Sequence, residues 1–305
     1  MTKLGDWSNK AWIRLKNDKP SVQRETGYYF KPSLVPVSLH PRVIKAGHDV
    51  TEKLQILHLY HYLDGVDTLE TEIINRSLQN IFRGVIDLEI PEELKEDAYK
   101  IYIDEGFHAF MSYELKNKIV QQTRVQYTRK PNLLKTVDLI EKQMMQVSPA
   151  LRNLVQFLAS ATNETLISAN LLQCKDKDLR SSVSSYLSSH LKDEAKHHLY
   201  FASLFQVIWK QFSLHEKKTL GVILPRLIKI LLSVNKENIC SDLVEVGFSK
   251  KEADLIFSES YDKVPMDMIE SAAKPALTLF NKCHVFDVKE VRDSFLEEGF
   301  RLQSV

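Results

Sequence analysis

The chain has 305 residues, of which 44% are hydrophobic, so it is long enough to form one large domain or two around a sizeable core. Its 41 basic and 40 acidic residues give a formal net charge of +1, which argues against a broad electrostatic attraction to nucleic acid or to an anionic membrane. The three cysteines are far apart and form no Cys-x-x-Cys pair, which argues against a disulfide framework or a cysteine-based zinc site and favours a reducing compartment.

The sequence does not predict a secretory or membrane-spanning segment. We expect no signal peptide, because polar residues such as Asp6 and Asn9 stand where the apolar core of such a peptide would lie. The longest apolar stretch, residues 220–232, is interrupted by Pro225 and Arg226 and cannot span a bilayer. These features favour a soluble, cytoplasmic protein with neither a membrane nor a nucleic acid as its partner.

Residues 1–49 predict an irregular arm packed on the outside of a core. Prolines at positions 20, 32, 36 and 41 interrupt helices there, and Trp7, Trp12 and Phe30 supply apolar anchors. From about Thr51 the pattern changes to long helical periodicity with few residues that break helices. We therefore expect a helical core that begins near residue 50.

The periodicity predicts long helices and then shorter ones. The long helices are expected at roughly 51–83, 92–121, 133–147, 150–173, 178–211 and 215–234. The shorter ones are expected near 249–259, 264–282 and 287–300. Ser249, three residues before Glu252, predicts a capping box. We expect one all-α domain, made of the arm at 1–49, a helical bundle at 50–235 and a helical C-terminal extension at 236–305.

Two copies of the pattern Asp-Glu-x-x-His, at residues 104–108 and 193–197, carry the strongest functional signal. Each copy places a carboxylate and an imidazole three residues apart, on one face of a helix. In four-helix bundles that hold two metal ions, two helices each give Glu-x-x-His and the two others give one Glu each. The copies therefore predict four metal ligands: Glu105, His108, Glu194 and His197.

Two single carboxylates complete the expected set. In the 51–83 helix, Glu70 lies on a mostly apolar face, whereas Glu72 lies on a polar one. A lone buried carboxylate is too costly unless it is paired or bound to metal, so Glu70 is the ligand candidate and Glu72 is expected in solvent. Glu164 is the one acidic residue of the 150–173 helix and shares its face with small and apolar side chains. Four carboxylates and two imidazoles suit iron or manganese better than zinc.

A third imidazole extends the second copy backwards. His190 lies four residues before Glu194 and seven before His197, so all three share one stripe of the predicted helix. The alternative interpretation is an ordinary pair of salt-bridged helices, which either copy alone would favour. The second copy and the two matching single carboxylates argue against that alternative.

Four further polar residues near these patterns receive other roles. His58 and His61 belong to no carboxylate–histidine pattern and are interpreted as structural or surface residues. Asp104 and Asp193 either orient ligand imidazoles from behind or lie in solvent.

Together these segments resemble the p-aminobenzoate N-oxygenases, the AurF-like di-iron oxygenases. The resemblance rests on Glu70 followed five residues later by Asn75, on residues 104–108, on Glu164 within residues 163–168, and on residues 190–197. It covers roughly residues 35–235 and implies a ferritin-like four-helix bundle core with extra N- and C-terminal helices. It also implies that His190 is the additional ligand that separates this family from ferritins.

The resemblance implies a non-haem di-iron monooxygenase that activates O2 and oxidises an amine nitrogen in a biosynthetic pathway. An arylamine would pass through the hydroxylamine to nitroso and nitro products. The implied cofactors are two iron ions, with manganese as the alternative, and O2 is the co-substrate. A homodimer is implied as well, and the helical C-terminal region is a candidate for its interface.

Electrons are expected from an external reductase or a small reductant. The sequence shows no flavin or nicotinamide fingerprint and no cysteine set for an iron–sulfur cluster. Two other functions stay open: the same centre used for C–H hydroxylation or desaturation of a small organic substrate, and a ferritin-like iron-binding protein. His190 and the apolar lining of the site argue against the iron-binding protein.

Overall fold

The fold is known from a computed structural model that describes residues 3–15, 26–127, 132, 134–261 and 266–302. Regular structure in these ranges is helical, apart from one isolated parallel β-bridge between Tyr28 and Leu179. The predicted all-α class is confirmed. Among the described helices, none is both long and apolar enough to cross a membrane.

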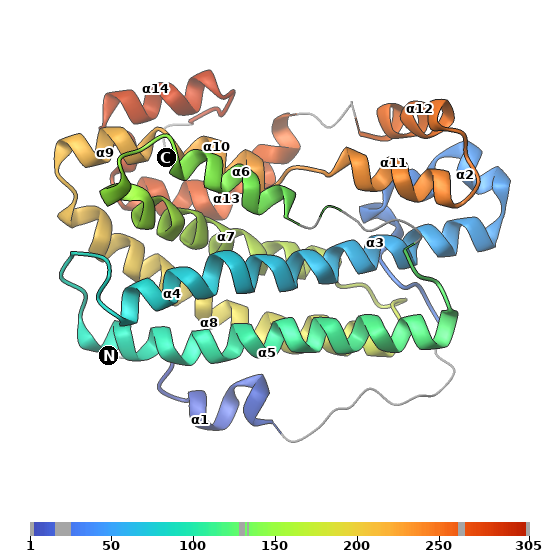
Figure 1. Ribbon diagram of the computed structural model, residues 1–305, viewed down its shortest axis with the longest axis horizontal. Coiled ribbons are helices and arrows are strands. Elements are labelled where there is room, and N and C mark those ends of the chain that lie inside the picture. The colour runs from blue at the N-terminus through green and yellow to red at the C-terminus, as the bar shows by residue number, and fades with distance from the viewer. Residues whose placement is uncertain (1–2, 16–25, 128–131, 133, 262–265, 303–305) are drawn as a thin grey trace.

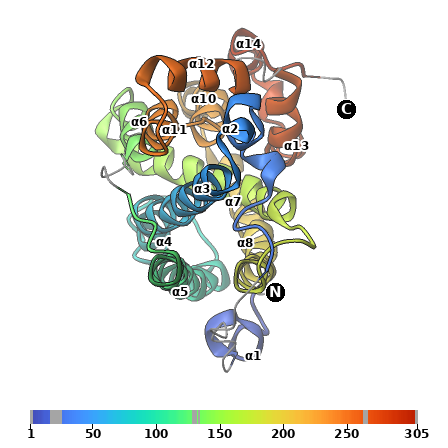
Figure 2. The same cartoon turned by 90° about the vertical axis from the view of Figure 1, so that its right-hand side faces the viewer.

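Four long helical segments form a ferritin-like bundle (Figure 1). The first segment is α3 (His48–Leu69), continued by η4 (Glu70–Ile74) and α4 (Asn75–Phe82); the others are α5 (Glu92–Thr123), α7 (Arg152–Cys174) and α8 (Ser181–Gln211). The first segment packs on α5, α5 packs on α8, α8 packs on α7, and α7 returns to η4 and α4. Figure 2 shows these helices nearly end-on, around a common interior.

The helix predicted at 51–83 contains a local irregularity at a site residue. It begins after Gly47, whose φ of 112° suits glycine, and it ends before Gly84, where φ is 66°. Between these ends, residues Glu70–Ile74 adopt a π-helical turn, which the periodicity did not predict. Single π turns inside α-helices occur frequently at functional sites.

The other predicted long helices were confirmed to within a few residues, with one exception. The single helix predicted at 215–234 is wrong, because the structure has α9 (Leu214–Gly221) and α10 (Leu224–Leu231) with a break between them. Pro225 lies in the first turn of α10, and its missing N–H cannot continue the hydrogen bonding of a preceding helix. The structure also contains α11 (Lys236–Glu245), which was not predicted.

Shorter helices cover one side of the bundle, as the upper half of Figure 1 shows. Besides α9, α10 and α11 they are α6 (Lys135–Met144), α12 (Lys250–Tyr261), α13 (Met266–Lys282) and α14 (Lys289–Glu297). The predicted capping box at the start of α12 was confirmed. The Ser249 hydroxyl accepts from the Glu252 amide at 3.3 Å, and the Glu252 carboxylate accepts from the Ser249 amide at 3.0 Å.

The described part of the N-terminal region packs against the bundle in two places. The helix α1 (Trp7–Lys10) and the 3-10 turn η1 (Trp12–Arg14) lie along α5 and α8. Further on, α2 (Pro41–Ala46) packs on α3 and departs from the expected irregular structure. Pro41 occupies the first helical position, where an N–H has no helical partner, so proline is tolerated. We propose that the arm, the bundle and the C-terminal helices form one domain.

The apolar core divides into two clusters along the bundle. One contains Ile73, Ile101 and Tyr200 among its members, and the other contains Leu63 and Leu187. On the α3–α4 segment, α5 and α8 the predicted ligands lie between residues of these two clusters. On α7, Glu164 lies between Ala161 and Leu166 of the first cluster, and the second cluster begins further along at Leu171. The polar site therefore interrupts the core at mid-length and has apolar packing on both sides.

Candidate metal centre

All seven predicted ligands are buried inside the bundle. None exposes more than 1% of its surface, and they come from all four segments: Glu70 from η4, Glu105 and His108 from α5, Glu164 from α7, and His190, Glu194 and His197 from α8. Glu72, two residues after Glu70, is 35% exposed in its side chain and pairs with Arg76. The predicted contrast between the two carboxylates was confirmed.

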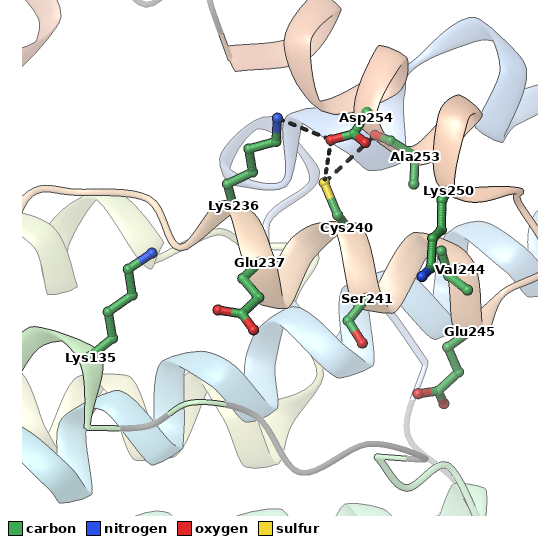
Figure 3. A pocket seen from close by; sticks show the side chains of 10 residues that line it. All are labelled: Lys135, Lys236, Glu237, Cys240, Ser241, Val244, Glu245, Lys250, Ala253 and Asp254. Carbon is green, nitrogen blue, oxygen red and sulfur yellow. Dashed lines mark hydrogen bonds and ion pairs between the residues drawn. The ribbon is translucent and has the colours of Figure 1, made fainter.

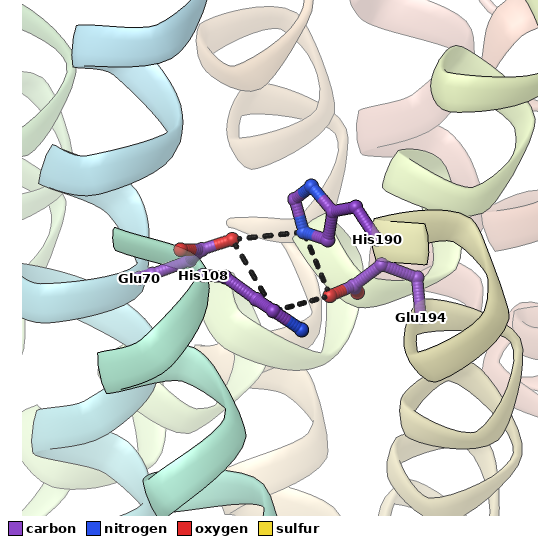
Figure 4. Close-up of side chains that lie close together, drawn as sticks. All are labelled: Glu70, His108, His190 and Glu194. Carbon is purple, nitrogen blue, oxygen red and sulfur yellow. Dashed lines mark hydrogen bonds and ion pairs between the residues drawn. The ribbon is translucent and has the colours of Figure 1, made fainter. Parts of the chain in front are cut away.

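The first group of candidate ligands consists of Glu70, His108, His190 and Glu194 (Figure 4). The Nε2 atom of His190 lies 3.1 Å from Oε1 of Glu70 and 3.1 Å from Oε1 of Glu194. The Nδ1 atom of His108 lies 3.9 Å from Oε1 of Glu70 and 3.3 Å from Oε1 of Glu194. The four potential ligand atoms lie within 4.8 Å of one another, so one cation could contact all of them.

The second group consists of Glu105, His108, Glu194 and His197 and also lies within 4.8 Å. The Nδ1 atom of His197 lies 2.8 Å from Oε1 of Glu105 and 3.4 Å from Oε1 of Glu194. The Nδ1 atom of His108 lies 3.5 Å from Oε2 of Glu105. Because His108 and Glu194 belong to both groups, the two candidate metal positions are adjacent.

Glu164 is not a member of either compact group. The side-chain amide of Asn163 donates to its Oε1 at 3.4 Å, and its Oε2 has no hydrogen-bond partner among the described residues. Burial, followed by the nearby negative charge of Glu194, raises its pKa well above the usual range. Glu164 therefore lies within electrostatic reach of the cluster, with one oxygen free for a further ligand bond.

Burial and the neighbouring histidines shift the pKa values of the cluster carboxylates in opposite directions. Burial raises the pKa of Glu70 to about 7, although His190 opposes the shift. Burial would also raise the pKa of Glu194, but the surrounding histidines, His197 first, lower it well below the usual range. Such a set of buried ionisable groups is stable only if protons or cations balance the charge.

Neighbouring carboxylates also determine the direction in which the pKa values of His108 and His197 shift. Burial alone would lower the pKa of His108 and of His197, but neighbouring carboxylates raise both well above the usual range. The carboxylates that act most strongly are Asp193 on His108 and Glu105 on His197. The carboxylates thus favour positive charge at these rings, and a bound cation would also supply it.

Unpartnered atoms indicate that the residues fit a metal. Within the described part of the chain, several buried atoms of the cluster make no hydrogen bond of suitable geometry, although some of them lie close to an oppositely charged neighbour. They include both carboxylate oxygens of Glu70 and of Glu105, one oxygen each of Glu164 and Glu194, and Nδ1 of His108 and His197. An unsatisfied buried polar group costs about 1–3 kcal/mol. Cations would satisfy these atoms together, and a donor set rich in oxygen with some imidazole suits iron or manganese.

Asp104 and Asp193 each contact a histidine of the opposite helix at Nε2, the ring nitrogen that faces away from the cluster. Both are 1% exposed, so the alternative of solvent exposure is wrong. Asp104 of the first copy lies 3.3 Å from Nε2 of His197, and Asp193 of the second copy lies 3.5 Å from Nε2 of His108. A carboxylate at Nε2 favours the tautomer that protonates this nitrogen, which leaves Nδ1 directed at the cluster.

His58 and His61 lie outside both groups, which confirms their structural interpretation. Burial lowers the pKa of His58 to about 3, and its ring packs 4.8 Å from that of Phe30. His61 contacts Asp242 of α11 at 2.8 Å and the Tyr127 hydroxyl at 3.1 Å. The pair therefore helps to attach neighbouring elements to α3.

A surface pocket of about 760 Å³ lies between α11 and α12, with Lys135 of α6 at its edge (Figure 3). Its lining includes Cys240 and the ion pair of Lys236 with Asp254 at 3.0 Å. None of the seven candidate ligands lines it. Among the described residues, the lining of this pocket contributes to neither compact group of potential metal ligands, so the chemistry is better placed in the bundle.

Comparison with known proteins agrees with the geometry. The family model described as AurF, p-aminobenzoate N-oxygenase AurF, matches residues 4–253. This range is wider than the expected 35–235 and takes in the N-terminal arm as well as α11. A search of curated proteins finds no match to the chain.

Proposed function

The chain belongs to the AurF family of p-aminobenzoate N-oxygenases, and we propose that it is a non-haem di-iron monooxygenase acting on an amine nitrogen. Its substrate is a small organic amine, and an arylamine would be oxidised to the hydroxylamine and on to nitroso or nitro products. The observation that carries the proposal is the pair of buried ligand groups that share His108 and Glu194.

We assign seven metal ligands on this basis. They are Glu70, Glu105, His108, Glu164, His190, Glu194 and His197. Iron is the proposed metal, with manganese as the alternative, because oxygen and imidazole donors suit both. When bound, two iron ions would supply the redox chemistry that O2 requires as co-substrate.

The protein's own residues prepare the site for that chemistry. Glu70, with a pKa of about 7, gives up a proton on metal binding, so ligand formation and proton release are linked. Asp104 and Asp193 hold the tautomers of His197 and His108. The apolar clusters on both sides of the site exclude water, which strengthens electrostatic interactions within it.

The electrons are proposed to come from an external reductase or a small reductant, as the resemblance implies. The same metal centre used for C–H hydroxylation or desaturation is the principal alternative, because the ligands do not determine which substrate atom is attacked. A ferritin-like iron-binding role is less well supported, since His190 lies among the ligands at 3.1 Å from two carboxylates.

A homodimer is also proposed, and the exposed side of α5, rather than the C-terminal region suggested by the sequence, is its proposed interface. Four large apolar side chains between 43% and 61% exposed follow one another there: Tyr99, Ile103, Phe110 and Tyr113. Their spacing repeats as in a coiled-coil seam, and exposed Gly106 occupies the middle position of that seam. A glycine there lets a second helix approach closely. Light scattering should give about twice the 35.3 kDa chain mass, and Phe110→Glu should return a monomer.

Product analysis tests the proposed activity. The protein is loaded with ferrous iron, supplied with a reductant and ¹⁸O₂, and offered aminobenzoates and alkylamines with mass detection. The expected product carries ¹⁸O on nitrogen. ¹⁸O on carbon, or a desaturated product without ¹⁸O, would establish the alternative use of the centre, and accumulation of ferric oxide without any effect of substrate would establish an iron-binding protein.

A further inference from the structure

The N-terminal arm is hydrogen-bonded to the back of the candidate metal centre. Trp7 of α1 is buried, and its indole Nε1 donates to both oxygens of Asp104 at 2.8 Å. The same carboxylate lies 3.3 Å from Nε2 of His197. A continuous line of polar contacts therefore runs from the arm through Asp104 to a proposed ligand.

A second line runs from the same arm to the other side of the centre. The backbone amide of Trp12 donates to Oδ2 of Asp193 at 2.9 Å, and this oxygen lies 3.5 Å from Nε2 of His108. The Trp12 ring packs 5.9 Å from the ring of His108 and edge-on to Phe107 at 5.5 Å. One short segment thus reaches both histidines of the two Asp-Glu-x-x-His copies.

Each N–H of the arm restricts how its carboxylate can turn. A carboxylate that accepts a fixed N–H on one side presents its remaining lone pairs in a fixed direction to the imidazole on the other. Asp193 has additional support, because Nζ of Lys196 lies 3.2 Å from its other oxygen. The orientation of Asp104 depends more directly on the arm, since the indole N–H of Trp7 contacts both oxygens of the Asp104 carboxylate.

We propose that the arm is a clamp for the metal centre, in which the Trp7 indole and the Trp12 amide position His197 and His108 through Asp104 and Asp193. The inference rests on the proposed function only in that it takes the cluster to bind two iron ions. Trp7 and Trp12 act as positioning residues, because neither is a ligand. Outer hydrogen-bond partners of ligating histidines change metal affinity by about 10- to 100-fold when they are lost.

Trp7→Phe tests the first line, because it keeps an aromatic ring and removes the indole N–H. The matched control is Trp209→Phe, since Trp209 is also buried but its indole N–H has no hydrogen-bond partner among the described residues. The readout is anaerobic calorimetric titration of the metal-free protein with Fe²⁺ alone. We expect Trp7→Phe to weaken one of two binding steps about 10- to 100-fold, and Trp209→Phe to leave both steps unchanged.

A pair of variants at position 12 tests the second line. Trp12→Ala keeps the backbone N–H, whereas Trp12→Pro removes it along with the ring. The backbone accepts proline there: Trp12 is the first residue of η1, and Ala11 before it is extended at φ −63° and ψ 142°. Iron affinity should be lower in Trp12→Pro than in Trp12→Ala, and this difference isolates the amide.

Affinity for Fe²⁺ separates this inference from the proposed enzymatic activity. Wild-type affinities in Trp7→Phe, or equal affinities in Trp12→Pro and Trp12→Ala, would overturn the clamp. If the wild-type protein binds two irons but oxidises no amine, the proposed activity fails while the clamp is still judged by these titrations. Thermal melting of the metal-free variants shows whether they fold. A variant that melts like Trp209→Phe but binds iron more weakly supports positioning over a purely structural role.

Discussion

Replacing Glu70 by Gln should stabilise the metal-free protein at pH 8 while weakening its affinity for metal. Glu70 is buried in the bundle, and burial raises its pKa from the ordinary 4.5 to about 7. The pKa of Glu70 is higher in the folded state than in the unfolded state, so the protonated side chain favours folding relative to the ionised one. This contribution to the free energy of unfolding is fully present below pH 4.5 and is lost as the pH rises through about 7. At pH 8 the carboxylate is ionised and opposes folding, whereas an amide stays neutral.

The size of the effect follows from the shift. One pKa unit corresponds to about 1.4 kcal/mol, so a rise from 4.5 to about 7 corresponds to about 3 kcal/mol at pH 8. Most of the gain should be lost near pH 5, where Glu70 is protonated in the folded metal-free protein. The same substitution removes a proposed negative ligand and should reduce iron affinity.

Urea unfolding at pH 8 and pH 5, in the presence of a chelator, measures the free energy of unfolding. Glu72→Gln is the matched control, because Glu72 is partly exposed and its pair with Arg76 should contribute no more than about 1 kcal/mol. If Glu70→Gln has the wild-type free energy of unfolding at pH 8, or a lower one, then burial of ionised Glu70 does not destabilise the metal-free fold.

Four further predictions concern metal binding. His190→Ala should lower the iron content from two ions per chain towards one, because His190 contacts both carboxylates of the first group at 3.1 Å; two irons by metal analysis would remove it from the site. Asp193→Asn should weaken iron binding about 10- to 100-fold by calorimetry, and unchanged affinity would show that its contact with His108 does not matter. Ferrous iron at 100 times its dissociation constant should stabilise the fold by about 2.7 kcal/mol, seen as a higher melting temperature than with chelator; equal melting temperatures would contradict binding to the native state. Iron affinity should rise from pH 6 to pH 8, because Glu70 must lose a proton near pH 7; an affinity that is flat or falls over this range would contradict the assignment.

The burial of the proposed ligands could be predicted because the relevant information is local to each helix. Periodicity alone distinguishes the apolar face of Glu70 from the polar face of Glu72, and the energetic penalty for a buried lone charge points to a binding role. The same reasoning located Glu164. It could not show that Glu164 lies outside the two compact groups, since that depends on how α7 sits against α5 and α8.

Features that depend on the relative position of distant segments could not be predicted. The crossing of Asp104 to His197 and of Asp193 to His108 follows from how α5 and α8 are aligned, which no pattern within either helix specifies. The contact of Trp7 with Asp104 joins residues 97 positions apart, and the arm has no periodicity to indicate its place. The break before α10 is different, because it could have been predicted: Pro225 lacks the N–H that a continuous helix needs at this position.

Anomalous diffraction at the iron edge, from crystals of the iron-loaded protein, tests directly whether the bundle holds two iron ions. The proposed di-iron site predicts two peaks in the bundle, one within the group that contains Glu70 and His190 and one within the group that contains Glu105 and His197, with His108 and Glu194 between them. A single peak, or none inside the bundle, would contradict it.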